Sequence, residues 1–289
     1  MPKVLIVGCG DLGGAVAGQL VQLGIQTAGV KRSAGQLDGV SMMQADVTKP
    51  ESLKVLKKTQ PEILIYCVAA NGQTDEQYKT HYVDGLRNVL VTQSENTKLK
   101  HVFFVSSTRV YGQADDAVLD ETIAAIPADF GGKRLLEAER LLDSMICSST
   151  ILRLSGIYGA GRLRMINLAK SPENWPAKNS WTNRIHRDDA AAFIVHLIKN
   201  VLPVNTVNTV RPCYIVTDSK PVSQYEVLRW IATQLHTNIP VSINPPVEGG
   251  KRLSNQAMLA TGLILQYPDY QTGYQALLTE YFINQASTL

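Results

Sequence analysis

The feature that most constrains the fold of this chain is the segment VLIVGCGDLGGAVAGQL, residues 4–20. A short apolar run, typical of a buried strand, leads through glycines into an amphipathic helical pattern. Gly8, Gly10 and Gly13 have the spacing GxGxxG. At these positions glycine permits a tight turn, close approach of a pyrophosphate and close packing of helix on strand, with the helix N-terminus facing the anion. The segment therefore predicts a dinucleotide site, and a plain glycine-rich turn is the alternative.

Apolar runs alternate with amphipathic helical patterns through the first half of the chain. Runs of this kind are expected for strands that are buried on both faces. They cover residues 3–7, 25–30, 41–45, 62–69, 101–107 and 150–155. Strict alternation of strands and helices predicts an α/β fold, a Rossmann-type doubly wound parallel sheet.

The alternation ends after residue 155. Residues 156–184 are rich in Gly, Pro, Asn and Trp and predict loop, whereas residues 213–218 predict a further strand. Ser223 and Glu226 form a capping box for a helix that extends to about His236. We expect a nucleotide-binding domain of residues 1–158 and about 185–236, and a small C-terminal lobe of about 159–184 and 237–289.

Composition excludes several classes of protein. Hydrophobic residues make up 45% of the 289 residues, which is enough for a sizeable core. The net charge of +3 is spread along the chain, so nucleic-acid binding is not expected. The sequence opens with a strand leading directly into the glycine loop, and it contains no apolar run of membrane-span length. We therefore expect a cytoplasmic protein without a membrane partner.

The four cysteines indicate neither a metal centre nor a disulfide framework. Cys9, Cys67, Cys147 and Cys213 lie far apart, and no CxxC motif or His/Cys cluster is present. No metal site is expected. Cys9 and Cys67 lie within apolar runs, so both are predicted to be buried thiols.

The end of the second predicted strand bears on the type of dinucleotide. An NAD site usually has an acidic residue there, about 20 residues beyond the glycines, to bind the ribose hydroxyls. This chain has Lys31 and Arg32 instead. Two cations would attract a 2′-phosphate, and arginine can bind it with two hydrogen bonds. The pair favours NADP over NAD, and a solvated basic pair is the alternative.

Four further segments carry a family resemblance: VFFVSSTRVYG (102–112), RLSGIYGAGR (153–162), NRIHRDDAAA (183–192) and KRLSN (251–255). Together they resemble the extended short-chain dehydrogenases/reductases, which include NAD(P)-dependent epimerases and dehydratases of nucleotide sugars. The likeness is greatest to an atypical subgroup with incomplete catalytic residues. The resemblance implies that the C-terminal lobe binds the substrate, a nucleotide sugar or another carbonyl compound, and that the protein is a monomer or homodimer.

The glycine motif and the resemblance together imply a set of site residues. Asp46 suits a contact with the adenine amino group, and Ala69 and Ala70 would let the cofactor lie close. The expected cofactor contacts are Gly8, Gly10, Asp11, Leu12, Gly13, Lys31, Arg32, Ser33, Asp46, Val47, Ala69, Ala70, Ser106, Lys133 and Leu154.

The resemblance also implies candidate catalytic and substrate residues. Ser107 corresponds to the family's catalytic serine, and His186 is a candidate acid or base near pH 7. For each, a purely structural role is the alternative. Candidate substrate contacts are Tyr82, Tyr158, Arg162 and Arg184, where arginine suits a carboxylate or phosphate.

The family's proton donor is absent from the sequence. The family uses a tyrosine with a lysine four residues later, and no lysine of this chain has a tyrosine at that spacing. The matching segment is IPADFGGKRLLEAERLL, residues 126–142. Alignment on Gly132 and Glu139 puts Gly131 at the tyrosine position and Leu135 at the lysine position.

Other alignments of this segment do not restore the pair. They match Asp129 with Lys133, or Phe130 with Arg134, and Tyr82 stands where the family has an asparagine. Two hypotheses follow. The chain is an NADP-dependent oxidoreductase with a replacement for the tyrosine, or it is an NADP-binding sensor without turnover. The missing residues and the short lobe weaken a third, a full epimerase of nucleotide sugars.

Overall fold

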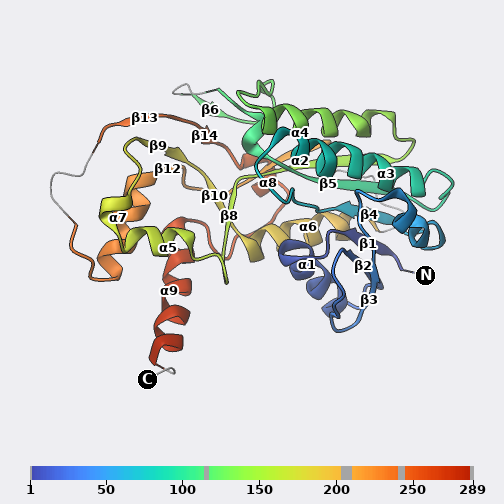
Figure 1. Ribbon diagram of the computed structural model, residues 1–289, viewed down its shortest axis with the longest axis horizontal. Coiled ribbons are helices and arrows are strands. Elements are labelled where there is room, and N and C mark those ends of the chain that lie inside the picture. Colours follow the sequence, from blue (N-terminus) through green and yellow to red (C-terminus); the bar gives the residue numbers. More distant parts are fainter. Residues whose placement is uncertain (1, 114–116, 203–209, 240–244, 287–289) are drawn as a thin grey trace. The chain divides into compact units, whose positions relative to one another are not determined.

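The computed structural model describes residues 2–113, 117–202, 210–239 and 245–286 (Figure 1). The chain divides into two compact units. Unit 1 comprises Met1–Gly112, Ala124–Arg153 and Ala190–Tyr214. Unit 2 comprises Gln113–Ile123, Leu154–Asp189 and Ile215–Leu289.

Unit 1 is built on a seven-stranded sheet with the strand order β11-β7-β5-β4-β1-β2-β3. Strand β1 pairs in parallel with β2 and β4, β2 with β3, and β4 with β5. The chain moves outward from β1 to one edge and then from β4 to the other, as in a doubly wound fold. The Rossmann-type prediction is therefore confirmed. The strands are β1 (Val4–Val7), β2 (Thr27–Lys31), β3 (Val40–Gln44), β4 (Ile63–Tyr66), β5 (His101–Ser107), β7 (Ser148–Leu154) and β11 (Cys213–Val216).

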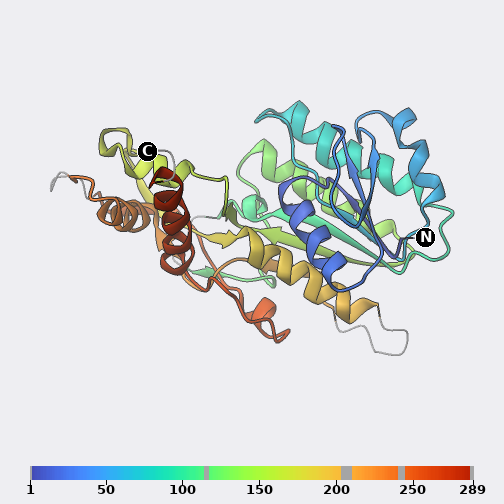
Figure 2. The ribbon, with the colours of Figure 1, turned by 90° about the horizontal axis from the view of Figure 1, so that it is seen from below.

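Helices cover both faces of this sheet. Helices α1 and α6 lie on one face, and α2, α3 and α4 lie on the other (Figures 1 and 2). The inner strands β1 and β4 are apolar and buried at every residue because helices cover both of their faces, whereas the edge strand β3 is only partly buried. The helices are α1 (Asp11–Gln22), α2 (Asp75–Tyr78), α3 (Gly85–Thr92), α4 (Phe130–Arg140) and α6 (Arg187–Val201). Shorter helical segments are the 3-10 helices Pro50–Lys58, Thr108–Val110 and Leu141–Ser144, and the π-helix Lys79–Asp84.

Unit 2 combines short strands with helices around an apolar core. Its core includes Tyr158, Ile166, Trp175, Leu228 and Tyr274. Within its described residues the strands form three small sheets, β10-β8, β12-β9-β13 and β14-β6. They are β6 (Val118–Leu119), β8 (Gly156–Tyr158), β9 (Asn179–Thr182), β10 (Arg184–His186), β12 (Val222–Ser223), β13 (Val247–Gly250) and β14 (Arg252–Leu253). The helices are α5 (Arg164–Ala169), the 3-10 helix Pro172–Asn174, α7 (Gln224–Gln234), α8 (Gln256–Leu259) and α9 (Tyr270–Ala286).

In unit 2 the start of α7 lies where the sequence predicts it, whereas residues 156–184 differ from their prediction. Ser223 caps α7 as predicted, because its Oγ accepts a hydrogen bond from the Glu226 N–H at 3.2 Å. The prediction of loop for residues 156–184 is wrong, since β8, α5, β9 and β10 lie there. These elements are too short for a periodic signal and depend on packing; Ile166 and Ala169 of α5, for example, are fully buried.

The structure bears on two expectations from the sequence, the lack of a membrane-spanning segment and the state of the four cysteines. Among the described residues, no helix is long and apolar enough to cross a lipid bilayer. All four cysteines are thiols rather than disulfides. Cys9 is buried as expected, whereas Cys67 is only half-buried.

Candidate functional site

The glycine loop between β1 and α1 has a shape that only glycine allows at two of its positions. Gly8 has a φ of +93°, and a Cβ there would collide with the carbonyl oxygen of Cys67. A Cβ at Gly13 would collide with the carbonyl oxygen of Gly8, so this glycine lets α1 pack closely on β1. A Cβ at Gly10, in contrast, would meet no atom within 4 Å. No atom of the described residues therefore blocks a side chain at position 10, and the space beside Gly10 is free of protein atoms.

The N-terminus of α1 lies at this open space. Gly10 is the N-cap residue and provides no side chain to cap the helix. Backbone N–H groups of the first helical turn have no acceptor within the helix, and together with the helix dipole they favour an anion. Asp11 is exposed in this turn, while Leu12 is buried against the sheet. The loop therefore has the geometry of a phosphate-binding helix start.

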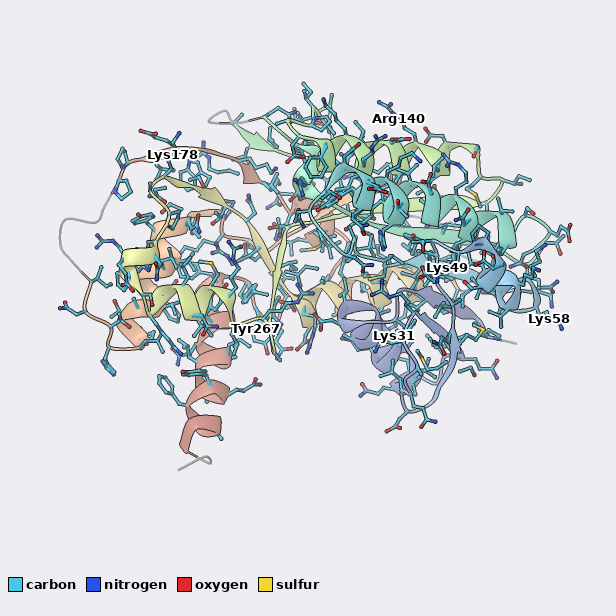
Figure 3. The ribbon with its side chains drawn as sticks, viewed as in Figure 1. Lys31, Lys49, Lys58, Arg140, Lys178 and Tyr267 are labelled. Carbon is cyan, nitrogen blue, oxygen red and sulfur yellow. The ribbon has the colours of Figure 1, made fainter. Side chains whose placement is uncertain are left out.

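Lys31 and Arg32 stand at the carboxyl end of β2, the strand next to β1. Lys31 lies at the end of β2 beside α1 (Figure 3). Burial raises the pKa of the Cys9 thiol to about 11, and the charge of Lys31 opposes that rise, so this ammonium lies near the glycine loop. Arg32 is exposed, and its backbone carbonyl accepts a hydrogen bond from Gln44 Nε2 at 3.1 Å. Two cationic side chains thus follow each other at the carboxyl end of β2.

A groove follows directly after Arg32. It has a volume of about 650 Å³ and lies between the β2–β3 connection and the outer strand β3. Ser33 lies at its start, and Met42 and Gln44 of β3 lie at its other side. The groove and the two cations belong to one stretch of chain, so a group bound by Arg32 would border the groove.

Asp46 and Val47 follow β3 and are held in place locally. Asp46 Oδ1 accepts hydrogen bonds from the Thr48 N–H at 3.0 Å and the Thr48 hydroxyl at 2.8 Å. Burial raises the pKa of Asp46, but these hydrogen bonds and the charges of Lys49 and Arg32 outweigh it and hold the pKa below its usual range. Asp46 is therefore ionised near neutral pH. The carbonyl of Val47 accepts a hydrogen bond from Asn88 Nδ2 at 2.9 Å.

Small side chains and a buried polar network follow the next two strands. Ala69 is exposed and Ala70 half-buried after β4. Ser106 is buried, and its hydroxyl donates to Glu139 Oε1 at 2.6 Å. Arg153 donates to both oxygens of Glu139, at 3.1 and 2.7 Å. The hydroxyl of Ser106 is thus committed to the protein. Leu154, the next residue, is buried at the end of β7.

Ser107 ends β5 and caps the short helix that follows. Its Oγ accepts a hydrogen bond from the Arg109 N–H at 3.2 Å, and the side chain is half-buried. The hydroxyl proton of Ser107 remains available to a ligand in this arrangement.

The start of α4 (Phe130–Arg140) is capped by a carboxylate and lies against an arginine. Asp129 is the N-cap and accepts a hydrogen bond from the Gly132 N–H at 2.9 Å. Lys133 is exposed in the first turn, and Leu135 is buried at 1% exposure. The guanidinium of Arg109 lies against Gly131, where a Cβ would come within 2.5 Å of its Cζ. Arg109 was not identified as a candidate from the sequence. Its position two residues after Ser107 is the one signal in the sequence that could have indicated it.

Tyr82 lies in the π-helical segment Lys79–Asp84, between α2 and α3. Its ring is 5.2 Å from that of Tyr78, and burial raises its pKa to about 12. A phenol with such a pKa is protonated near neutral pH and acts as a hydrogen-bond donor. π-Helical turns often occur at functional sites, where they alter which side chains share a face.

The remaining candidates lie in unit 2. His186 is buried; its Nδ1 accepts a hydrogen bond from the Asp188 N–H at 3.3 Å, and its ring is 3.9 Å from that of Tyr267. Burial lowers the pKa of His186, so the ring is neutral with the proton on Nε2. Tyr158 stacks on Tyr274 at 4.6 Å and meets the ring of His186 edge-on.

The two arginine candidates of unit 2 differ in environment. Arg162 is exposed. Arg184 is buried; its Nη2 donates to Thr182 Oγ1 at 2.6 Å, while its Nη1 has no hydrogen-bond partner among the described residues. Arg184, His186 and Tyr158 come together in unit 2 because β10 pairs with β8, with His186 opposite Tyr158.

The sheet order and the glycine-loop geometry are those of a Rossmann-type α/β protein. Similarity over nearly the whole chain makes it a member of the extended short-chain dehydrogenase/reductase class. Within that class the chain belongs to the family described as RmlD substrate binding domain, whose model matches residues 2–281.

Individual relatives agree with this assignment. A candidate NAD-dependent epimerase/dehydratase of Methylobacillus flagellatus is 49% identical, with a TM-score of 0.88 over 97% of this chain and 98% of that one. Protein YeeZ of Escherichia coli is 30% identical over 173 residues, which are 56% of this chain and 61% of YeeZ. The Bordetella bronchiseptica enzyme WbmG, whose structure is a complex with NAD and UDP, shares the fold with a TM-score of 0.78 at 16% identity, over 96% and 95% of the chains.

Proposed function

We propose that this protein is an oxidoreductase of the extended short-chain dehydrogenase/reductase class that binds a nicotinamide dinucleotide, NADP(H) in preference to NAD(H). The substrate we propose is a carbonyl compound, with nucleotide sugars as one candidate class. The observation that carries the proposal is the glycine loop, where Gly8 and Gly13 shape the backbone and Gly10 leaves open space at the start of α1.

The residues around the loop fit such a cofactor. The N–H groups at the start of α1 would hold the pyrophosphate. Ala69 and Ala70 leave room beside β4, and the ionised Asp46 would accept a hydrogen bond from the adenine amino group. When bound, the cofactor supplies the hydride, while the protein binds and orients the reactants.

The preference for NADP rests on Lys31 and Arg32. A 2′-phosphate between an ammonium and a guanidinium would gain charge-assisted hydrogen bonds, each contributing about 1.5–3 kcal/mol. NAD lacks this phosphate and gains nothing from the two cations. The fold relative WbmG was determined with NAD, so the preference has to be tested on this chain itself.

The first prediction tests the cofactor directly. Titration by NADPH fluorescence should give a lower Kd for NADPH than for NADH in the wild type. Arg32→Ala should raise the Kd for NADPH by roughly 10- to 100-fold and leave that for NADH unchanged, because it removes one charge-assisted contact. Lys58→Ala, a basic residue at the end of the 3-10 helix Pro50–Lys58, is the control. Equal affinities for the two cofactors, or no effect of Arg32→Ala, would contradict the assignment to NADP.

For the substrate, we propose that Ser107 donates a hydrogen bond to the reacting oxygen, and that unit 2 is the substrate lobe. Tyr82, Tyr158, Arg162 and Arg184 are the proposed substrate contacts, with His186 as a candidate acid or base. A panel of ketones, aldehydes and nucleotide sugars, followed by NADPH oxidation, tests this. Ser107→Ala should lower turnover without changing NADPH affinity.

A second candidate function is an NADP-binding sensor without turnover. The alignment on Gly132 and Glu139 favours it, because the family's tyrosine and lysine would then fall on Gly131 and on Leu135, which is buried. Tight binding of NADPH without oxidation by any member of the panel would support the sensor. Turnover that Ser107→Ala abolishes would exclude it.

A further inference from the structure

The guanidinium of Arg109 takes the space that a tyrosine at position 131 would need. An ideal Cβ on Gly131 would lie 2.5 Å from Arg109 Cζ, 2.6 Å from Nε and 2.8 Å from Nη1. A real Cβ essentially never approaches other heavy atoms so closely, so a side chain at position 131 and Arg109 in this position exclude each other. The absent tyrosine therefore leaves a space filled by a cation, not an empty one.

This guanidinium is fixed on several sides. Its Nε donates to both oxygens of Asp129, at 3.0 and 2.9 Å. Its Nη1 donates to Gln73 Oε1 at 2.8 Å and to the Tyr78 hydroxyl at 2.7 Å. Cζ also lies 4.9 Å from the centre of the Tyr78 ring and 5.1 Å from that of Phe130. Such a set of contacts orients the side chain before any ligand arrives.

One nitrogen of the guanidinium, Nη2, makes no hydrogen bond within the part of the chain that the structure describes. The hydrogen bonds of Arg109 within the described residues involve Nε, Nη1 and the backbone N–H, and none involves Nη2. The side chain is 29% exposed. The Arg109 backbone N–H binds Ser107 Oγ, so the serine hydroxyl and the arginine come from the same turn after β5. The carboxyl ends of parallel strands form the ligand-binding edge of such sheets.

We propose that Arg109 replaces the missing tyrosine as the residue that contacts the reacting oxygen of the substrate, together with Ser107. This assignment rests on the proposed oxidoreductase function and adds the identity of the group at the start of α4. A guanidinium stays protonated and cannot act as an acid, so its contribution is a hydrogen bond from Nη2 to the oxygen as negative charge develops there.

The reaction balances without a protein acid. A bound NADPH would supply the hydride that forms the C–H bond at the carbonyl carbon, so the carbonyl would be reduced and the nicotinamide oxidised. The π electrons of the C=O bond move to the oxygen, which Arg109 and Ser107 stabilise. A water molecule then gives the proton that completes the alcohol and leaves as hydroxide.

The charges of Arg109 and Asp129 indicate the class of substrate. Asp129 is ionised, because hydrogen bonds from Gly132 and Arg109 outweigh its burial and hold its pKa below the usual range. The Arg109–Asp129 pair therefore has no net charge. Such a pair suits a neutral ketone or aldehyde oxygen that becomes negative during the reaction better than a substrate carboxylate or phosphate.

A thermal double-mutant cycle tests whether Arg109 and a side chain at position 131 compete for one space. The variants are Arg109→Ala, Gly131→Tyr and the double variant, followed by circular dichroism without cofactor. Gly131→Tyr alone should lower the melting temperature, and adding Arg109→Ala should restore part of it because the ring enters the vacated space. A double variant that melts no higher than Gly131→Tyr would overturn the claim that the two groups share one space.

A kinetic comparison tests the contact with substrate. Arg109→Met and Arg109→Lys are compared with Arg134→Met, a matched control whose side chain is 28% exposed and pairs with Asp75. Phenanthrenequinone is the fixed carbonyl probe, and NADPH affinity is measured in parallel. Arg109→Met should lower kcat roughly 100-fold, as loss of an oxyanion-binding donor does, with NADPH affinity retained. Arg109→Lys should retain part of the activity, and Arg134→Met should equal the wild type.

Two outcomes would overturn the assignment, and they differ. Activity of Arg109→Met within about threefold of the wild type would mean that Arg109 only fills space, while the oxidoreductase function stands. A wild type that binds NADPH and reduces neither phenanthrenequinone nor any member of the panel of ketones, aldehydes and nucleotide sugars would remove the oxidoreductase function itself and the contact that depends on it.

Discussion

The buried ion pair between Glu139 and Arg153 gives the most quantitative prediction of stability. Glu139 is 3% exposed and Arg153 is 9% exposed. The carboxylate accepts three hydrogen bonds, one from Ser106 and two from Arg153. Burial lowers the pKa of Arg153, but its hydrogen bonds with Glu139 outweigh that effect and raise the pKa, so the guanidinium is charged. Removing only the negative partner leaves a charge buried without compensation.

Glu139→Gln is the least disruptive way to do this. The amide has nearly the shape of the carboxylate, but one of its oxygens becomes an NH2 group that must face a donor. Two charge-assisted hydrogen bonds of about 1.5–3 kcal/mol each are weakened or lost. Breaking a buried pair from one side usually costs about 3–5 kcal/mol, and we expect a loss in this range for the free energy of unfolding of unit 1.

The control is Glu137→Gln on the same helix. Glu137 accepts a hydrogen bond from Arg134 at 2.8 Å, but its side chain is 41% exposed, so its loss should cost at most about 1 kcal/mol. Urea unfolding followed by circular dichroism compares the two variants. Trp175, Trp181 and Trp230 all lie in unit 2, so tryptophan fluorescence reports that unit separately. Variants that differ by less than about 1 kcal/mol would refute the reasoning on burial.

Two further predictions concern the acid stability of unit 1 and its glycine loop. Burial lowers the pKa of His101 to about 4, below the ordinary value of about 6.5, so the unfolded chain takes up the proton first and stability falls as pH drops from about 6.5 toward 4. This dependence amounts to about 2 kcal/mol at pH 5, and in urea titrations it should disappear in His101→Gln. Gly8→Ala should cost more stability than Gly24→Ala, because both glycines have positive φ but only at Gly8 would the Cβ meet backbone, at the Cys67 carbonyl. Equal losses in thermal unfolding would count against the collision.

The sequence predicted well those parts of the fold that follow from local patterns. The run HVFFVSS coincides with β5, and Ser223 caps α7 as its spacing with Glu226 implies. Both signals are local, an apolar strand buried on two faces and a side chain bonding the first turn of a helix. The short elements between residues 156 and 184 carry no such signal, because a six-residue helix such as α5 depends on the core against which it packs.

In the candidate site, too, local features could be predicted from the sequence and features that depend on packing could not. The glycine spacing alone indicated the backbone of the loop, since each role depends on the absence of a Cβ. The position of Arg109 was not predictable, because its side chain reaches Asp129 and Gly131 about twenty residues further along the chain. The pairing of Glu139 with Arg153 depends in the same way on the packing of α4 against the sheet. Long side chains that join distant segments become visible only once the fold is known.

The most direct test of the central claim is the affinity for NADPH of Gly10→Ala compared with Gly18→Ala. In both cases a Cβ would meet no atom within 4 Å, so neither variant introduces a collision within the described residues. Gly18 lies on the exposed side of α1, whereas Gly10 borders the space proposed for the pyrophosphate. We predict that Gly18→Ala binds NADPH like the wild type and that Gly10→Ala binds it at least about tenfold more weakly, because the methyl group keeps the phosphates from the backbone. Equal affinities of the two variants would contradict the account.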